Sequence, residues 1–365
     1  MIYSRLKKVF SLFLVVGMLF TLTGCGKEEK TENAASPVEV LLVTDYGTIN
    51  DGSFNQGAWE GISEFAKKNG TLIDYYQPEN TSTESYINAM ERGIDNGAKV
   101  IVCPGYLLEE AVYKAQSEYP DVQFVLIDGQ PHNEDYTDQL IADNTLSVLF
   151  SEEEAGFLAG YSAVREGYTN LGFIGGVPAD TVIKYGYGFV QGADYAAIEM
   201  GVEVHIRYTY ADTFDDTDAV ETTASTWYED DTEVIFACGG QLGRAVIRAA
   251  EKNDGKVIGV DVDQSSESEV VMTSAVKSLA SAVSEVLDDY SQGKFFGGQP
   301  KIFTSKENGV CLPMDNSRFE RFTKEQYDNI FSRLSEGMIV PYGGTDIGTT
   351  QELTLINTEV TYIIL

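Results

Sequence analysis

The chain has 365 residues, of which 43% are hydrophobic and 11% aromatic, a composition typical of folded globular proteins rather than disordered ones. Its formal net charge is −32, and so acidic a surface repels phosphate backbones and anionic lipid headgroups. Nucleic acid and free nucleotides are therefore poor candidate partners, and a neutral small molecule is favoured, although acidity can also serve solubility alone.

Residues 1–24 are typical of a secretory signal peptide. A basic segment, residues 5–8, precedes an apolar stretch over residues 9–20, which is shorter than the roughly 20 residues that a membrane-spanning helix needs. The following Leu22-Thr-Gly-Cys25 resembles the lipobox of bacterial lipoproteins, in which the cysteine is acylated. We therefore expect a lipid anchor on Cys25 at the extracytoplasmic face of the cell membrane; an ordinary signal peptide with a chance cysteine is the alternative.

The next segment, residues 25–37, is rich in polar residues and has no apolar periodicity. Such a segment buries too little apolar surface to offset the entropy of ordering it, so we interpret it as a flexible tether. The folded part is expected to begin near Val38.

Short apolar runs alternate with helical patterns along the rest of the chain. The strand-like runs are residues 38–44, 71–76, 99–104, 123–128, 170–175, 203–210, 233–238 and 256–261. The helical patterns are residues 53–69, 142–164, 187–200, 243–253 and 274–292. This alternation predicts an α/β protein with parallel sheets that helices cover on both faces.

About four strand–helix units precede residue 140 and about four follow it, which predicts two similar α/β lobes joined by a hinge. Lobe 1 is expected over residues 38–143, with about 263–295 returning to it. Lobe 2 is expected over residues 144–262, with about 296–365. The C-terminal tail, residues 345–365, ends in an apolar segment, residues 362–365, and could add an edge strand to a lobe.

Polar residues, glycines and one aromatic residue follow the predicted strands. In open α/β sheets, ligands bind outside the carboxyl ends of the strands. The candidates at these positions are Asp45, Asn50, Phe54, Asn55, Asp128, Gly240 and Asp261. They suit a polar, flat, hydroxylated ligand. Ordinary structural roles stay open for several of them, because Asp51 beside them can cap a helix, Phe54 can belong to the core and Asp128 can end a strand in a turn.

Catalytic and metal-binding patterns are absent from the sequence. It contains neither a phosphate-binding G-x-x-x-x-G-K-[ST] loop nor a G-x-S-x-G nucleophile turn, and its two histidines are His132 and His205. The stretch that begins at Asp261 lacks the glycine and the glutamate of a calcium loop. No C-x-x-C pair occurs, and Cys103 and Cys238 lie in strand-like runs as expected for buried, inert thiols. We therefore expect no enzyme, no metal and no cofactor.

Several motifs together resemble the basic membrane lipoprotein family, the purine-nucleoside-binding lipoproteins that serve ABC transporters. They are Asp45-x-Gly47, Asn50-Asp-Gly-Ser-Phe54-Asn55-Gln-Gly-Ala-Trp-Glu-Gly61, Glu154-Ala-Gly-Phe-Leu-Ala-Gly160, Gly188-Phe189-Val-Gln-Gly192, Gly259-Val-Asp261-Val-Asp-Gln264 and Thr273-Ser-Ala-Val-Lys277. The resemblance spans roughly residues 38–344. It implies the type I periplasmic-binding fold, in which the ligand lies between two lobes.

The resemblance also implies roles for individual residues. Phe54 and Phe189 resemble the two aromatic walls that hold the base, and Asp128 resembles the carboxylate at the base edge. An ionised carboxylate only accepts hydrogen bonds, which favours the ring N–H of guanosine or inosine over adenosine. Asp261 and Lys277 resemble the residues that bind the ribose hydroxyls, although Lys277 could also be a solvated helix residue. Asp45, Asn50, Asn55 and Gly240 would add further ligand contacts.

The expected function is therefore capture of a purine nucleoside and its delivery to an ABC permease. Three alternatives remain at this point. The protein could be a ligand-sensing surface lipoprotein that acts on a membrane receptor, or an enzyme that acts on nucleosides, or the same fold could bind a sugar or another small metabolite.

Overall fold

The computed structural model describes residues 38–345 and 350–364. Residues 37–365 form one compact unit. The expected signal peptide, the tether and acylation of Cys25 lie outside the described residues. Among the described helices, none combines the length and the apolarity that crossing a membrane requires.

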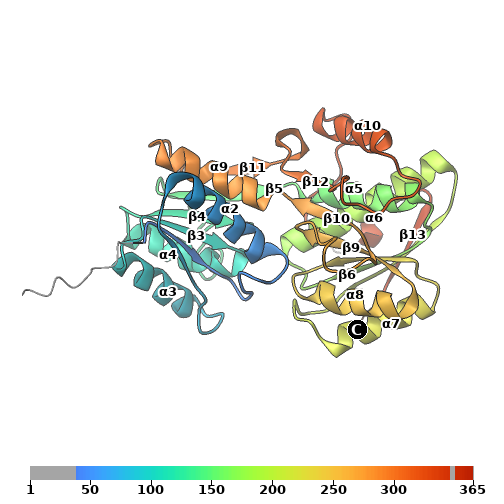
Figure 1. Ribbon diagram of the computed structural model, residues 1–365, viewed down its shortest axis with the longest axis horizontal. Coiled ribbons are helices and arrows are strands. Elements are labelled where there is room, and N and C mark those ends of the chain that lie inside the picture. The colour runs from blue at the N-terminus through green and yellow to red at the C-terminus, as the bar shows by residue number, and fades with distance from the viewer. Residues whose placement is uncertain (1–37, 346–349, 365) are drawn as a thin grey trace, which may run out of the picture. The chain divides into compact units, whose positions relative to one another are not determined.

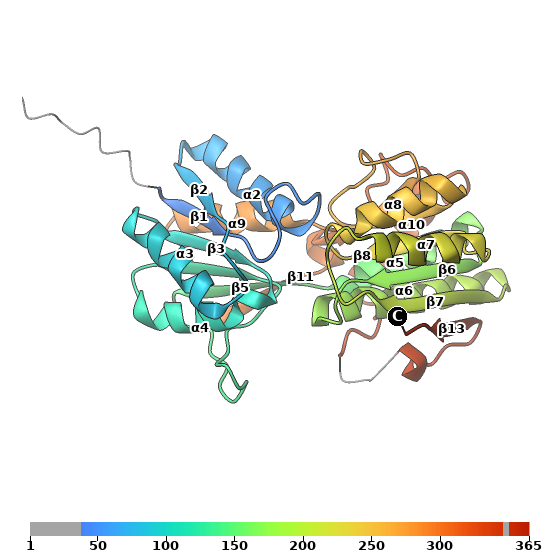
Figure 2. The ribbon, with the colours of Figure 1, turned by 90° about the horizontal axis from the view of Figure 1, so that it is seen from below.

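A six-stranded parallel sheet forms the first half of this unit, in the order β11-β5-β4-β3-β1-β2. Its strands are β1 (Val40–Val43), β2 (Ile73–Tyr76), β3 (Val100–Pro104), β4 (Gln123–Ile127), β5 (Thr145–Phe150) and β11 (Gln299–Phe303). Helices α2 (Phe54–Asn69) and α9 (Leu279–Ser291) cover one face, and α3 (Thr83–Asp95) and α4 (Glu109–Glu118) cover the other (Figures 1 and 2). Because both faces are covered, central strands such as β1 and β3 are buried throughout.

A seven-stranded sheet forms the second half, in the order β12-β10-β9-β8-β6-β7-β13. Its strands are β6 (Asn170–Gly175), β7 (Val204–Tyr210), β8 (Val234–Cys238), β9 (Lys256–Asp261), β10 (Val271–Lys277), β12 (Val310–Cys311) and β13 (Thr358–Tyr362). All neighbours are parallel except β10 and β12. Its helices are α5 (Glu152–Glu166), α6 (Asp180–Met200), α7 (Asp218–Glu229), α8 (Leu242–Asn253) and α10 (Lys324–Ser335). The pair α5 and α6 lies on the opposite face of the sheet from α7 and α8 (Figure 1).

Helices α5 and α6 pack backbone against backbone. A Cβ at Gly160 would lie 2.0 Å from the Phe189 carbonyl oxygen, and one at Gly188 would lie 2.0 Å from the Glu153 carbonyl oxygen. Only glycine allows this approach. The glycines of two motifs that carry the family resemblance therefore allow close packing of two helices, and this contact fixes the start of α5 against α6.

The sheets correct the expected lobe boundaries. Strand β5 and, later, β11 belong to the first sheet, although residues 144–262 and 296–365 were expected in lobe 2. Strand β10 belongs to the second sheet, so within 263–295 it is α9 that returns to the first. The predicted helix over residues 142–164 included β5, because the short apolar run of β5 continues into α5 and periodicity cannot separate a buried strand from a buried helix.

The C-terminal tail adds an edge strand to the second sheet, a possibility that the sequence left open. Strand β13 pairs in parallel with β7 over its whole length. The segment before it is held by Asp194 of α6, whose carboxylate accepts the backbone N–H groups of Ile356 at 3.0 Å and Asn357 at 2.7 Å.

Candidate functional site

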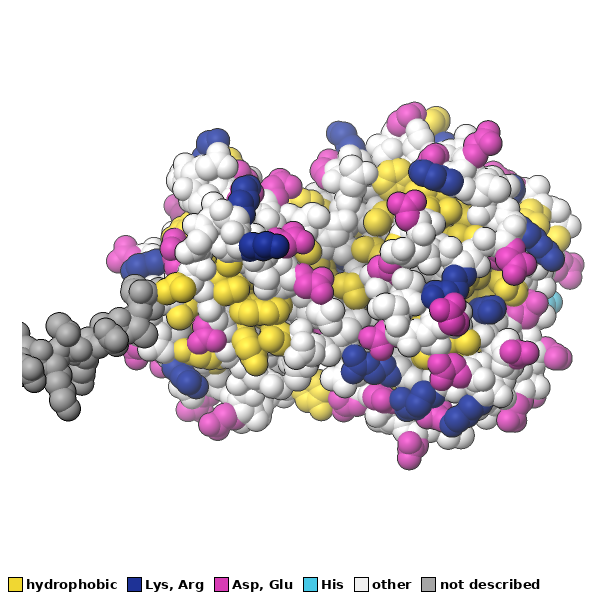
Figure 3. Space-filling model, in the orientation of Figure 1, with side chains coloured by type: hydrophobic (Ala, Val, Ile, Leu, Met, Phe, Trp, Pro, Cys, Tyr) yellow, Lys and Arg dark blue, Asp and Glu magenta, His cyan; other side chains and the backbone are white. Residues whose placement is uncertain are grey.

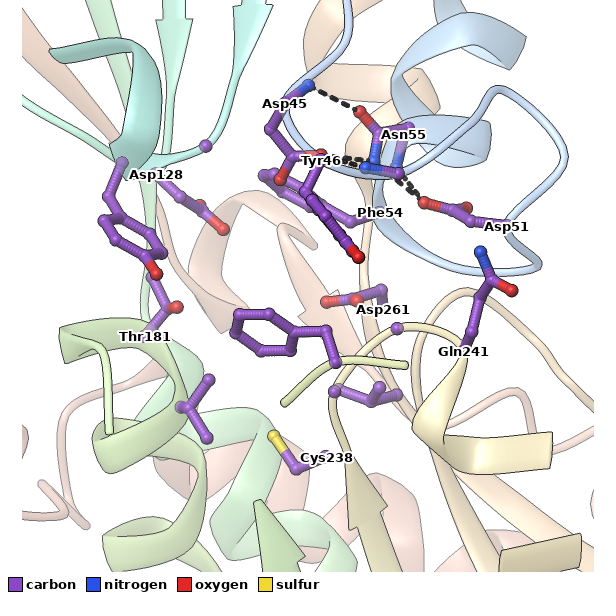
Figure 4. A pocket seen from close by; sticks show the side chains of 18 of the residues that line it. Asp45, Tyr46, Asp51, Phe54, Asn55, Asp128, Thr181, Cys238, Gln241 and Asp261 are labelled. Carbon is purple, nitrogen blue, oxygen red and sulfur yellow. Dashed lines mark hydrogen bonds between the residues drawn. The ribbon is translucent and has the colours of Figure 1, made fainter. Parts of the chain in front are cut away.

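A cavity lies where the carboxyl ends of the two sheets meet (Figure 4). Lining residues come from the last residues of strands and from the loops and helix starts that follow them. These strands are β1, β3 and β4 in the first sheet and β6, β7, β8, β9 and β10 in the second. The residues that line it include Asp45, Tyr46, Asp51, Phe54, Asn55, Tyr106, Asp128, Thr181, Tyr185, Phe214, Cys238, Gly240, Gln241, Asp261 and Lys277. Ligands are expected at this place in an α/β fold.

One end of the cavity is built on the start of α2. The Asp51 carboxylate accepts the backbone N–H groups of Ser53 at 2.9 Å and Asn55 at 3.0 Å. Asp51 therefore caps the helix, which is the ordinary structural role that the sequence had left open for it. The Asn55 side-chain amide donates to Asp51 at 2.9 Å and to Asp45 at 2.8 Å. Burial raises the pKa of Asp45 to about 6. These polar groups are thus held rigidly before any ligand arrives (Figure 4).

Two phenyl rings line the cavity. Phe54 is the first residue of α2. Phe214 lies in the loop after β7, and a Cβ at Gly176 would come within 2.3 Å of its ring, so the ring rests against a position that only glycine can fill. The Phe214 carbonyl also accepts the backbone N–H of Leu242, which starts α8, at 2.9 Å. The loop that carries this ring is therefore anchored to the second sheet's own helix.

Lys277 is the buried cation of the site, with its side chain 3% exposed. It donates a hydrogen bond to Asp128, and its Nζ lies 3.5 Å from Asp261 and 3.7 Å from Glu152. Burial alone would lower the pKa of Lys277, but the charges of Asp128 and its neighbours raise it above the ordinary value, so the ammonium persists. The Phe54 ring centroid is 4.8 Å from Nζ, which adds a cation–π contact.

Two strand-end aspartates have left-handed backbone. Asp128 has φ of 58° and Asp261 has φ of 67°. This conformation costs an ordinary residue about 1–2 kcal/mol, and such strain gathers at functional sites. At Asp261 the surroundings offset the cost, because Ser53 from the first half donates a 2.5 Å hydrogen bond to its carboxylate. The turn at each strand end directs the carboxylate into the cavity (Figure 4).

Of the predicted site residues, Asp45, Phe54, Asn55, Asp128, Gly240, Asp261 and Lys277 line this cavity. Asn50 does not: it is exposed, and its backbone N–H bonds to Thr48. Phe189 does not either. It is fully buried on α6, and its ring lies 5.4 Å from Phe236 and 6.3 Å from Phe173, centroid to centroid. The motif around Phe189 is a packing motif, so its ring belongs to the core and not to a wall of the site.

Sequence reasoning missed Phe214 together with Tyr46, Tyr106, Thr181 and Gln241. The signal for Phe214 was present, because it follows a predicted strand by four residues. It therefore lies at the carboxyl end of a strand, as the predicted site residues Asp45, Asp128 and Asp261 do. Tyr106 follows β3 in the same way.

Cys103 and Cys238 are buried as expected, and burial raises the pKa of both thiols, which disfavours reactive thiolates. Within residues 38–345 and 350–364, no three His, Cys, Asp or Glu side chains are grouped to hold a metal ion. On the face shown in Figure 3, acidic and basic side chains are interspersed rather than gathered by sign.

Relatives of known name match most of the chain. The nucleoside-binding protein BmpA of an ABC transporter from Lactococcus lactis subsp. cremoris is 30% identical, over 84% of this chain and 91% of its own. Basic membrane protein B from Borreliella burgdorferi is 31% identical, over 84% and 89%.

A solved solute-binding protein of an ABC transporter system from Aeropyrum pernix superposes with a TM-score of 0.69 at 24% identity, over 84% of this chain and 88% of its own, which supports the fold. The family model described as "ABC transporter substrate-binding protein PnrA-like" matches residues 38–342. The chain therefore belongs to the PnrA-like family of ABC transporter substrate-binding proteins.

Proposed function

We propose that this protein captures purine nucleosides, with guanosine and inosine favoured, and delivers them to an ABC permease. The observation that carries the proposal is the presence of two phenyl rings, Phe54 and Phe214, in one cavity with Asp128, Asp261 and Lys277. Rings of this kind stack on a flat base for about 1–3 kcal/mol per base. The name of the Lactococcus relative supports the same ligand class.

The polar residues suit the remainder of a nucleoside. Asp128 Oδ1 is buried and accepts no hydrogen bond from a described residue, so it is free to accept the ring N–H of a 6-oxopurine. Asp261 Oδ1 and Lys277 Nζ lie 3.5 Å apart. The carboxylate can accept a hydrogen bond from a ribose hydroxyl, and the ammonium can donate one. Adenosine offers a bare ring nitrogen to Asp128 and should bind more weakly.

The proposal includes export and a lipid anchor on Cys25. The observation is the lipobox-like segment Leu22–Cys25 after an apolar stretch. Labelling producing cells with a radioactive fatty acid should mark the wild-type protein and not Cys25→Ser. A labelled Cys25→Ser protein would contradict the anchor and leave the binding proposal untouched.

Calorimetric titration tests the cargo. The full-length chain in detergent, unfolded and refolded to remove co-purified ligand, is titrated with guanosine, inosine, adenosine, cytidine and ribose. We expect tight binding of the 6-oxopurine nucleosides, and loss of that binding in Asp128→Ala. Absence of heat with every nucleoside, from protein shown to be folded and empty, would refute the cargo assignment.

A further inference from the structure

Three buried carboxylate oxygens at the inner end of the cleft accept no hydrogen bond from any described residue. They are Oδ1 of Asp128 and both oxygens of Glu152. The Glu152 side chain is 1% exposed, and the ammonium groups of Lys184 and Lys277 each lie 3.7 Å away, beyond hydrogen-bonding distance. Buried polar atoms are nearly always hydrogen-bonded, so this group of oxygens indicates that a ligand supplies the donors.

Glu152 lies where the candidate cavity continues. A second cavity of about 510 Å³ adjoins the first, and Tyr106, Asp128 and Thr181 line both. Glu152 lines the second cavity beside Asp128. Lys277 contacts both carboxylates, which places them around a single ammonium. Asp128 lines both cavities, so it is the point at which a ligand in the first cavity comes nearest to the lining that Glu152 shares.

We propose that Glu152 is a second acceptor for the base, and that with Asp128 it selects nucleosides that carry an amino group next to the ring N–H, guanosine above all. The guanine edge presents the ring N–H and the 2-amino group as adjacent donors, whereas hypoxanthine in inosine has the ring N–H alone. Two carboxylates from different elements supply acceptors for both donors of guanine. This inference rests on the proposed function, and it adds the residue that distinguishes the two favoured ligands.

A competing role for Glu152 is to balance the charges of Lys184 and Lys277 without touching the ligand. The two roles make different predictions. A charge-balancing residue affects all nucleosides alike, because every ligand meets the same Lys277. A residue that accepts the 2-amino group affects guanosine and leaves inosine nearly unchanged, so the ratio of the two affinities is the decisive quantity.

Titration of the full-length chain with guanosine and inosine measures that ratio. For the wild type we expect guanosine to bind at least about tenfold more tightly, the value of one hydrogen bond to a charged acceptor. In Glu152→Leu, which removes both acceptors, the ratio should fall close to one. Glu152→Gln should keep part of the preference through its amide oxygen. The control is Glu154→Gln on the same helix, since Glu154 accepts the Ser305 backbone N–H at 2.7 Å and lines neither cavity.

Proton release gives a second readout that a structural role would not move. Burial, with a further contribution from the charge of Asp128, raises the pKa of Glu152 to about 8, so the free protein holds a proton there at neutral pH. A 2-amino donor stabilises the ionised form. Guanosine binding should therefore release a proton, and affinity for guanosine should rise as pH increases towards 8 and then level off. Heats measured at pH 7 in buffers of different ionisation enthalpy report this release, which should be absent in Glu152→Leu.

The outcomes separate this inference from the proposed function. Equal affinity of the wild type for guanosine and inosine would overturn the inference alone, and so would an unchanged ratio in folded Glu152→Leu. Failure to bind any nucleoside would overturn the proposed function and the inference with it. If Glu152→Leu does not fold, the wild-type ratio and Glu152→Gln still decide the matter.

Discussion

At the scale of single residues, Phe214 lines the cavity, whereas Phe189, which the family resemblance placed at the base, lies in the core. We expect Phe214→Ala to weaken nucleoside binding by about 1–3 kcal/mol through loss of stacking, with little change in stability, because its ring lines the cavity. Phe189→Ala should instead lower the free energy of unfolding by about 3–5 kcal/mol, because it empties a fully buried position. Calorimetric titration and urea unfolding of both variants measure the two quantities. A large loss of binding in a stable Phe189→Ala protein would contradict this assignment.

The same pair shows what the sequence could and could not predict about the site. Strand-end residues such as Asp128 and Asp261 were predictable, because parallel strands bring their carboxyl ends to one edge. Phe189 was misassigned because a helical motif of glycines and an aromatic residue looks the same in the sequence whether it packs against another helix or contacts a ligand. Glu152 gave no signal, because its burial depends on where two halves of the chain meet.

At the scale of secondary-structure elements, the sequence predicted the strands that a loop separates from the next helix. It did not predict those that run almost directly into an apolar helix. Strands β1 to β4 and β6 to β9 match the predicted runs. Strands β5 and β10 were merged into the helices that follow them, since one serine alone separates each strand from its helix. Lys277 is therefore the last residue of β10, and it is buried because of its place in the sheet. Helical periodicity could not have predicted this burial.

The C-terminal edge strand offers a test at this scale. Asp194→Ala removes the acceptor for the backbone N–H groups of Ile356 and Asn357, which leaves two donors unpaired beside β13. We expect a loss of stability of about 1–3 kcal/mol and faster hydrogen exchange across β13, with unchanged nucleoside affinity because no described residue after Lys277 lines the cavity. Glu359→Gln is the control, since this exposed residue of β13 forms only a surface ion pair with His205. Weakened ligand binding in Asp194→Ala would show that the tail supports the site.

At the scale of the whole folded unit, direct hydrogen bonds join the two halves across the cleft. Ser53 donates to Asp261 at 2.5 Å, and the Gln264 side chain donates to the Gly52 carbonyl at 2.9 Å. The Tyr46 hydroxyl donates to Asp215 at 3.1 Å, next to Phe214 in the same loop. The two halves are therefore in direct contact beside the cavity. If the halves open and close about a hinge, as two-lobed binding proteins do, we expect these bonds to break when a ligand leaves.

The Tyr46–Asp215 bond is the one that can be removed with least damage, because Tyr46 is 51% exposed and the substitution Tyr46→Phe keeps its ring. Losing a hydrogen bond worth about 0.5–1.5 kcal/mol should speed ligand dissociation about two- to twelvefold. The association rate should change less, since the bond forms only after the halves approach. Stopped-flow fluorescence with a bound nucleoside measures both rates, and Tyr75→Phe, at a partly exposed tyrosine in β2 away from the cavity, is the matched control. Equal dissociation rates for Tyr46→Phe and the wild type would mean that the buried contacts of Ser53, Gln264 and Lys277 hold the two halves together without it.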